Sequence, residues 1–166
     1  MNILDQIRQK TNAEFRPASP ADLEALRTLH LPEDILAFYR QAEPVKYAEI
    51  GKVRLWPITN ILEENKDYVP GYYANSCGYV VFSTTIYGDA FCFDTRSAVY
   101  PLNSAIVLIA HDLEPENDEI KREDLAKLAK PIAASFSDFL QAFVSEKLDT
   151  VPIYPANNFL PPAPNG

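Results

Sequence analysis

The hydrophobic pattern in the middle of the chain, in residues 79–94, predicts two strands joined by a turn. Residues 79–84 (YVVFST) are rich in β-branched and aromatic side chains, which favour a strand. Gly88 and Asp89 are suited to a tight turn, and residues 90–94 (AFCFD) follow as a second short strand. The two phenylalanines of this strand fall on one face, and its alanine and cysteine fall on the other. Because both faces are apolar, we predict a central antiparallel hairpin that is covered on both sides.

Apolar residues recur at helical spacing before and after this hairpin. Ser19 and Ser135 are good helix starts, because a serine hydroxyl can accept a hydrogen bond from an amide of the first turn. Thr59 is a comparable start for a shorter helix in residues 60–65. The predicted helices comprise residues 3–7, 20–30, 32–40, 60–65, 136–143 and a short helix around residues 125–128.

A two-residue turn, Gly51-Lys52, joins residues 47–50 to residues 53–56 and predicts a second hairpin. Further strand material lies in residues 99–102 and 105–109, whereas residues 68–75 are expected to be an aromatic loop and residues 112–123 an acidic, solvated one.

The order of these elements predicts the fold class. Helices come first, hairpins follow, and helices close the chain, without βαβ units. This order is typical of an α+β fold with a mostly antiparallel sheet flanked by helices. We expect a single domain in residues 1–150, followed by a Pro- and Asn-rich tail in residues 151–166.

Composition narrows the classes of partner. The chain has 166 residues, 47% hydrophobic and 23% charged, with a formal net charge of −8. Such a charge repels nucleic acid and suits either a basic protein partner or simple solubility. The first residues contain no apolar segment of the signal-peptide kind, and no stretch is long enough to span a membrane, so we expect a cytoplasmic protein.

Candidate catalytic chemistry is limited to one pair. Cys92 and His111 could act as nucleophile and base, with Asp94 or Asp112 orienting the imidazole. A thiol in the middle of an apolar strand is, however, a poor nucleophile. The cysteines and histidines lack the spacing of a metal site, and five glycines cannot supply a phosphate-binding loop. We therefore expect no enzyme activity, no cofactor and no metal, and reduced rather than disulfide-bonded cysteines.

Three motifs, in order along the chain, resemble the SUKH superfamily: LPEDILAFY (residues 31–39), GDAFCFD (residues 88–94) and SFSDFL (residues 135–140). This superfamily includes fungal cell-wall (glucan synthesis) regulators and many bacterial immunity proteins. The resemblance covers roughly residues 21–148 and implies a single curved sheet backed by helices, whose open face and surrounding loops hold a partner. It also implies a non-enzymatic role, either in neutralising a toxin domain, often a nuclease, or in regulating a host protein.

A surface that binds a basic toxin domain is expected to be acidic and aromatic. For Trp56, packing in the core is the simpler interpretation, and the tyrosines could equally fold over the core. Asp89 could serve the turn itself, and Asp94 could cap the strand end or pair with Arg96. The candidate partner-binding residues are Tyr47, Glu49, Tyr72, Tyr73, Tyr87, Asp89, Asp94 and Arg96.

Overall fold

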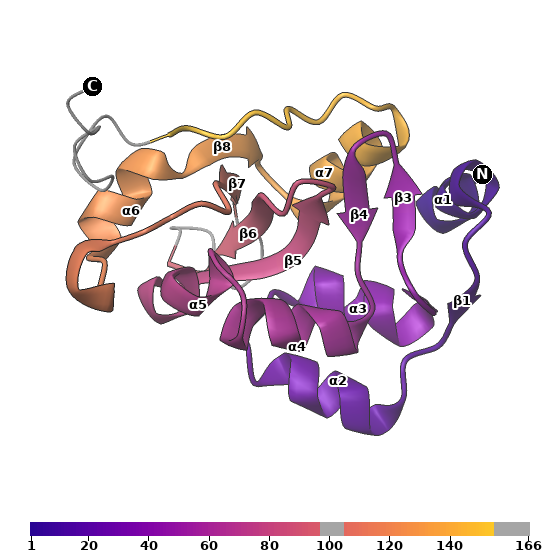
Figure 1. Cartoon of the computed structure of the whole chain (residues 1–166). Helices are drawn as coiled ribbons and strands as arrows, with labels where there is room; N and C mark the ends of the chain where they lie inside the picture. The colour runs from indigo at the N-terminus through magenta and orange to yellow at the C-terminus, as the bar shows by residue number, and fades with distance from the viewer. Residues whose placement is uncertain (97–104, 155–166) are drawn as a thin grey trace.

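The centre of the protein is a six-stranded antiparallel sheet in which each strand pairs with its neighbour along the chain (Figure 1). The computed structural model describes residues 1–96 and 105–154. The spatial order is β3 (Ala48–Ile50), β4 (Val53–Leu55), β5 (Tyr79–Thr85), β6 (Ala90–Asp94), β7 (Ile106–Ile109) and β8 (Lys130–Ala133). The predicted α+β class with an antiparallel sheet is confirmed, and so are both predicted hairpins.

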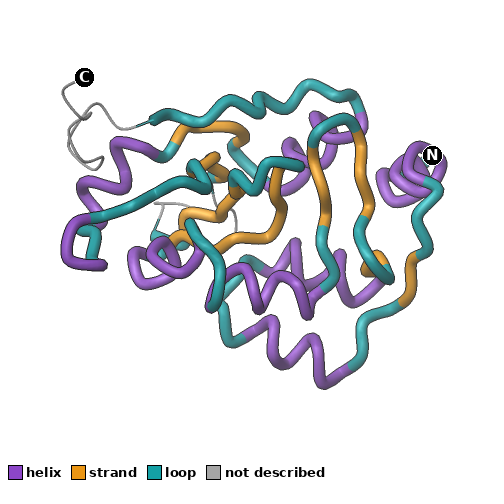
Figure 2. Tube along the Cα trace, viewed as in Figure 1, coloured by secondary structure: helices purple, strands orange, loops and turns teal. Residues whose placement is uncertain are grey.

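Helices surround this sheet, and a small second sheet pairs β1 with β2 (Figure 2). The serine caps are confirmed, because the hydroxyls of Ser19 and Ser135 accept hydrogen bonds from the amides of Asp22 and Asp138. The remaining elements are α1 (Ile3–Thr11), β1 (Phe15–Arg16), α2 (Pro20–Arg27), α3 (Glu33–Gln41), β2 (Glu43–Pro44), α4 (Ile58–Lys66), α5 (Gly71–Ala74), η1 (Asn75–Cys77), η2 (Glu116–Asp118), α6 (Arg122–Leu128) and α7 (Phe136–Val144).

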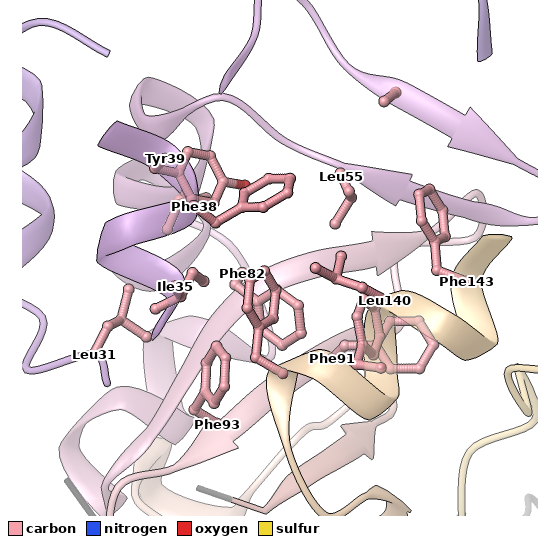
Figure 3. Close-up of a cluster of buried hydrophobic side chains, with 14 of the residues drawn as sticks. Leu31, Ile35, Phe38, Tyr39, Leu55, Phe82, Phe91, Phe93, Leu140 and Phe143 are labelled. Atoms are coloured by element: carbon pink, nitrogen blue, oxygen red, sulfur yellow. The ribbon is translucent and has the colours of Figure 1, made fainter. Parts of the chain in front are cut away.

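Aromatic side chains form the larger core, on the face of the sheet that α7 covers (Figure 3). Phe82 of β5 lies 4.5 Å from Phe93 of β6 and 4.8 Å from Phe139 of α7, measured between ring centroids. Phe91 contacts the same Phe139 ring edge-on, at 5.2 Å. Edge-to-face and tilted contacts of this kind stabilise aromatic pairs beyond the area that they bury. Strands β5 and β6 are thus fixed to the closing helix.

A second core lies on the opposite face of the same two strands. Val81 and Cys92 point into it and meet Leu125 of α6 and Ala74 of α5. The prediction that the central hairpin is covered on both sides is therefore confirmed. Both cysteines are buried and free, as expected. Helices α5 and α6 with η1 cover the outer side of the central strands, whereas Glu49 of β3 and Arg54 of β4 remain partly exposed. The open face that the family resemblance implies is therefore covered at the centre of the sheet and open at β3 and β4.

Three local expectations were wrong. Helix α4 begins at Ile58 with Pro57 as its N-cap, so Thr59 lies inside the helix and does not cap it. Residues 68–75 are not simply a loop, because they contain α5. Strand β8, which follows the short helix around residues 125–128, was not predicted; its edge position tolerates Pro131. The strand expected in residues 99–102 lies outside the described residues.

One buried side chain completes the sheet where β4 ends. The pairing of β5 with β6 shifts register between Val81 and Ser83, and β4 reaches no further than Leu55 along β5. Asn65 of α4 fills this position: its side-chain amide donates to the carbonyl of Val81 and accepts from the amide of Val81, both at 2.8 Å. It also donates to the carbonyl of Ile61 at 2.8 Å. Asn65 therefore takes the place of a neighbouring strand and ties α4 to the sheet.

Replacing Asn65 with alanine should destabilise the protein by about 2–3 kcal/mol, because it leaves buried backbone groups of β5 without partners. Urea denaturation followed by circular dichroism measures the loss. Glu63→Ala, at an exposed position of the same helix, is the matched control and should change stability little. A loss in the Asn65→Ala variant no larger than that of the control would contradict this role.

Candidate functional site

The eight candidate partner-binding residues do not form one surface. Tyr47 and Glu49 lie on or beside β3, and residues 72–73 lie on α5. Tyr87 and Asp89 lie at the turn before β6, whereas residues 94–96 lie at its far end. Five residues of strand separate these two ends by roughly 16 Å. The candidates therefore fall into four clusters, which we take in turn.

The α5 cluster lies against an acidic loop. We define the acidic–tyrosine surface as the tyrosines at 68, 72 and 73 together with Glu114, Glu116, Asp118 and Glu119. Tyr68 and Tyr72 are half exposed, at 54% and 51%, and all four acidic residues are exposed. Tyr73 is partly buried against the second core, and its ring meets that of Tyr72 edge-on at 5.0 Å. In Figure 1 α5 lies close to η2 on the side of the molecule that α6 occupies.

A hydrogen bond joins the two halves of this surface, because the Tyr73 hydroxyl donates to the carboxylate of Asp118. This bond raises the pKa of Tyr73 to about 12, with smaller contributions from desolvation and from the charge of Glu114. Residues 112–120 contain five acidic residues and no lysine or arginine. No salt bridge within the described chain neutralises the four acids of the surface. The surface is therefore negative, and the bond to Asp118 holds one of its tyrosines, Tyr73, in place.

The turn cluster is built around a buried carboxylate. The Asp89 side chain is 3% exposed, and its Oδ1 accepts from the His111 amide at 3.0 Å and lies 2.7 Å from His111 Nδ1. The Asp89 amide donates to the Thr85 hydroxyl at 3.2 Å. Asp89 thus fixes the turn, as the simpler interpretation held, and does not present its carboxylate to solvent. Tyr87, at the tip, is 58% exposed beside Lys52.

At the far end of β6, Asp94 accepts from the Arg96 amide at 3.0 Å, which confirms the strand-end cap. Its ion pair forms with Arg122 of α6, at 2.8 Å, and not with Arg96. Arg122 also lies over the Tyr79 ring at 4.6 Å. The Arg96 side chain lies against Gly78, where an added Cβ would come within 2.9 Å of it. Through Arg122, Asp94 and Tyr79 therefore anchor α6 to the sheet.

The fourth cluster covers the open face of β3 and β4. Arg54 pairs with Glu49 at 2.6 Å and lies over the Tyr47 ring at 4.9 Å. Trp56 meets the Tyr47 ring at 5.6 Å, and its indole nitrogen donates to the buried Thr84 hydroxyl at 2.7 Å. Trp56 is partly buried against the larger core, in agreement with the core interpretation. Sequence reasoning missed Arg54, whose partners Glu49 and Tyr47 lie across the hairpin on or beside β3.

Cys92 and His111 do not contact each other. The thiol of Cys92 is fully buried and lies near the Ala90 carbonyl, whereas His111 contacts Asp89. Burial raises the pKa of the Cys92 thiol far above its ordinary value. Over the ranges that the structure covers, no group of three or more His, Cys, Asp and Glu residues could hold a metal ion. In the same ranges no helix is long and apolar enough to cross a membrane.

The raised pKa of Tyr73 predicts a pH dependence. Because folding favours the protonated phenol, the contact with Asp118 contributes stability below pH 10, and this contribution is lost as the pH rises towards about 12. Asp118→Asn removes the negative acceptor and should lower the pKa of Tyr73 towards 10. An NMR titration of the Tyr73 ring carbon measures both values. Equal pKa values in the two proteins would show that the bond is absent in solution.

The buried thiol predicts low reactivity. Iodoacetamide at neutral pH should leave Cys92 unmodified in the folded protein and alkylate it only after denaturation, as read by mass spectrometry of peptides. Fast modification of Cys92 in the folded protein would contradict the burial and revive a nucleophilic role.

Comparison with known families agrees with the three motifs. A family model described as SMI1 / KNR4 family (SUKH-1) matches residues 17–142. This range includes β2 to β8 and most of α7, and with them the acidic–tyrosine surface. A search of curated proteins found no match. The chain belongs to the SMI1 / KNR4 family (SUKH-1).

Proposed function

We propose that this protein is a non-enzymatic immunity protein, which binds a basic toxin domain, such as a nuclease, and neutralises it. Family membership supports a binding role, because immunity proteins and cell-wall regulators both occur among SUKH proteins. The observation that carries the choice is the acidic–tyrosine surface. There the exposed Tyr68 and Tyr72 lie beside four carboxylates that form no salt bridge with any described residue.

The chemistry of this surface fits a cationic cleft. Nucleases bind phosphates with lysine and arginine, and exposed carboxylates can pair with the same side chains. Tyrosines add contact area at a small cost in side-chain entropy and are enriched among the residues that dominate binding energy. Tyr73 is already fixed by Asp118 and by packing on the second core, so less freedom is lost on binding.

Neutralisation in this proposal is steric. The protein covers the cleft of the toxin and competes with its substrate, and none of its own residues performs a chemical step. The negative charge of −8 speeds encounter with a basic partner, and salt should weaken this effect. We also propose that the protein acts in the cytoplasm, where a nuclease meets its substrate.

The partner can be sought among proteins encoded beside this gene. A toxin-like neighbour whose purified domain binds this protein, and loses activity on binding, supports the immunity role. A housekeeping or wall-synthesis partner that is bound without loss of activity would instead support the regulator role and overturn neutralisation.

Tyr72→Ala should weaken binding to the toxin domain about tenfold or more, because it removes an exposed aromatic contact. Tyr154→Ala is the matched control, since Tyr154 is equally exposed at 51% and lies outside the surface. Isothermal titration calorimetry measures the affinity of each variant for the toxin domain. Equal affinities of the two variants would remove α5 from the interface.

The double variant Glu116→Gln and Glu119→Gln should weaken binding severalfold at low salt and reduce its salt dependence. Glu24→Gln with Glu33→Gln, on α2 and α3, makes the same change in net charge at a distance. If both double variants behave alike, overall charge and not this surface steers the partner.

A further inference from the structure

The acidic loop beside α5 is fixed at both ends and held at one point between them. Leu113, at its start, is buried in the second core, and Ile120, at its end, packs against the same core. Residues 114–119, between these two, form no salt bridge with any described residue. Within the described chain, one hydrogen bond joins this segment to another element, and it runs from the Tyr73 hydroxyl of α5 to the Asp118 carboxylate.

The backbone of the loop is strained at this point. Asn117 and Asp118 have φ angles of 56° and 57°, in the left-handed region. The Glu119 amide donates to the Glu116 carbonyl at 3.3 Å, which closes a turn around them. Positive φ at both central residues is the pattern of a type I′ turn, which most often contains Asn-Gly. Here an aspartate occupies the position that favours glycine. Glycine would relieve the strain, but it would also remove the carboxylate that Tyr73 binds.

Like charges oppose the same conformation. The four acids of the acidic–tyrosine surface lie within residues 114–119. Charges this close together repel one another, and salt or a bound cation reduces the repulsion. Of the two basic residues that follow, Lys121 is exposed without a salt bridge to any described residue, and Arg122 pairs with Asp94. Strain and repulsion therefore oppose the turn, and the bond to α5 supports it.

We propose that the bond between Tyr73 and Asp118 is a latch, which holds residues 116–119 in the strained turn, and that the latched loop is the form that binds the basic partner. Strained residues persist where the surrounding structure fixes them, and they are concentrated at binding sites and switches. The identity of the partner rests on the proposed function, and the latch adds how that site is held ready for it.

Binding and latching support each other for an electrostatic reason. Cations of the partner neutralise the carboxylates that repel one another in the closed turn, so they stabilise the latched form. By linkage, a change that opens the latch weakens the binding of cations. The opposite arrangement, in which the partner pulls Asp118 away from Tyr73, predicts tighter binding once the tyrosine hydroxyl is removed.

The latch is tested on the protein alone. Tyr73→Phe removes the hydroxyl and keeps the ring that packs against the second core. Asn117→Val keeps both groups of the latch but disfavours the left-handed backbone, because valine is branched at Cβ. Asn12→Val is the matched control, since Asn12 is also an exposed asparagine with positive φ, 52°, at the end of α1. NMR relaxation of the backbone amides measures the order of the loop.

Both loop variants should lower the order parameters of residues 116–119 from about 0.85, the value of a rigid backbone, to below about 0.6. Asn12→Val should leave them unchanged. Wild-type values in Tyr73→Phe would show that the bond does not hold the turn, and wild-type values in Asn117→Val would show that no strain opposes it. Either result overturns the latch. Thermal unfolding shows whether each variant is folded, and if one is not, the other decides.

The link to binding is tested with tetralysine that has blocked ends, titrated into the full-length protein and followed by the amide shifts of residues 114–120. Tyr73→Phe should bind this probe about fivefold more weakly than the wild-type protein. Tyr68→Phe is the control, because the Tyr68 hydroxyl is exposed and forms no hydrogen bond with a described residue; it should bind as the wild-type protein does.

Equal or tighter binding of tetralysine by Tyr73→Phe, or no saturable shift in the wild-type protein, would overturn the link between the latch and the partner. None of these measurements uses a toxin domain, so failure of the latch and failure of neutralisation are distinguishable.

Discussion

The burial of β5 and β6 on both faces is the constraint on which the rest of this structure depends. Alternate residues of two neighbouring strands supply two separate cores, one aromatic beneath α7 and one of smaller side chains beneath α5 and α6. The phenylalanines fix α7 to one face of the sheet. On the other face, Cys92 and Val81 pack against α5 and α6, which form a second layer. Beyond the end of β4, Asn65 hydrogen-bonds to the backbone of Val81 and so ties α4 to β5. With both faces of the central strands occupied, the surfaces left for a partner are loops, strand ends and the exposed edge.

This constraint explains why the candidate site lies away from the centre. The second layer carries α5 outward, and the acidic loop after β7 returns beside it, so that Tyr73 and Asp118 meet across 45 residues of sequence. The carboxylate of Asp89 is buried in the turn before β6, where it contacts His111, and Arg122 of α6 pairs with Asp94. Two acidic candidates therefore hold the fold together, and the acids that face solvent lie in the loop.

The sequence predicted the fold better than the site. The spacing of side chains in residues 90–94 predicted which residues of β6 face each core. The serine caps and the turn at Gly51 predicted where helices and strands begin and end, because these signals are local. Strand β8 was missed, since Pro131 is tolerated only because the strand lies at an edge. Tyr72 and Tyr73 were chosen for their type, but the acids beside them were interpreted as a solvated loop. Their contact depends on how α5 packs, which no spacing along the chain records.

Hydrogen exchange of the protein alone and bound to the proposed toxin domain is the most direct test of the central claim, that the acidic–tyrosine surface binds the proposed partner. Our account predicts that binding slows exchange in residues 68–74 and 114–120, while α2 and α3 exchange as before. Slower exchange confined to α2 and α3, with residues 68–74 and 114–120 unchanged, would contradict it.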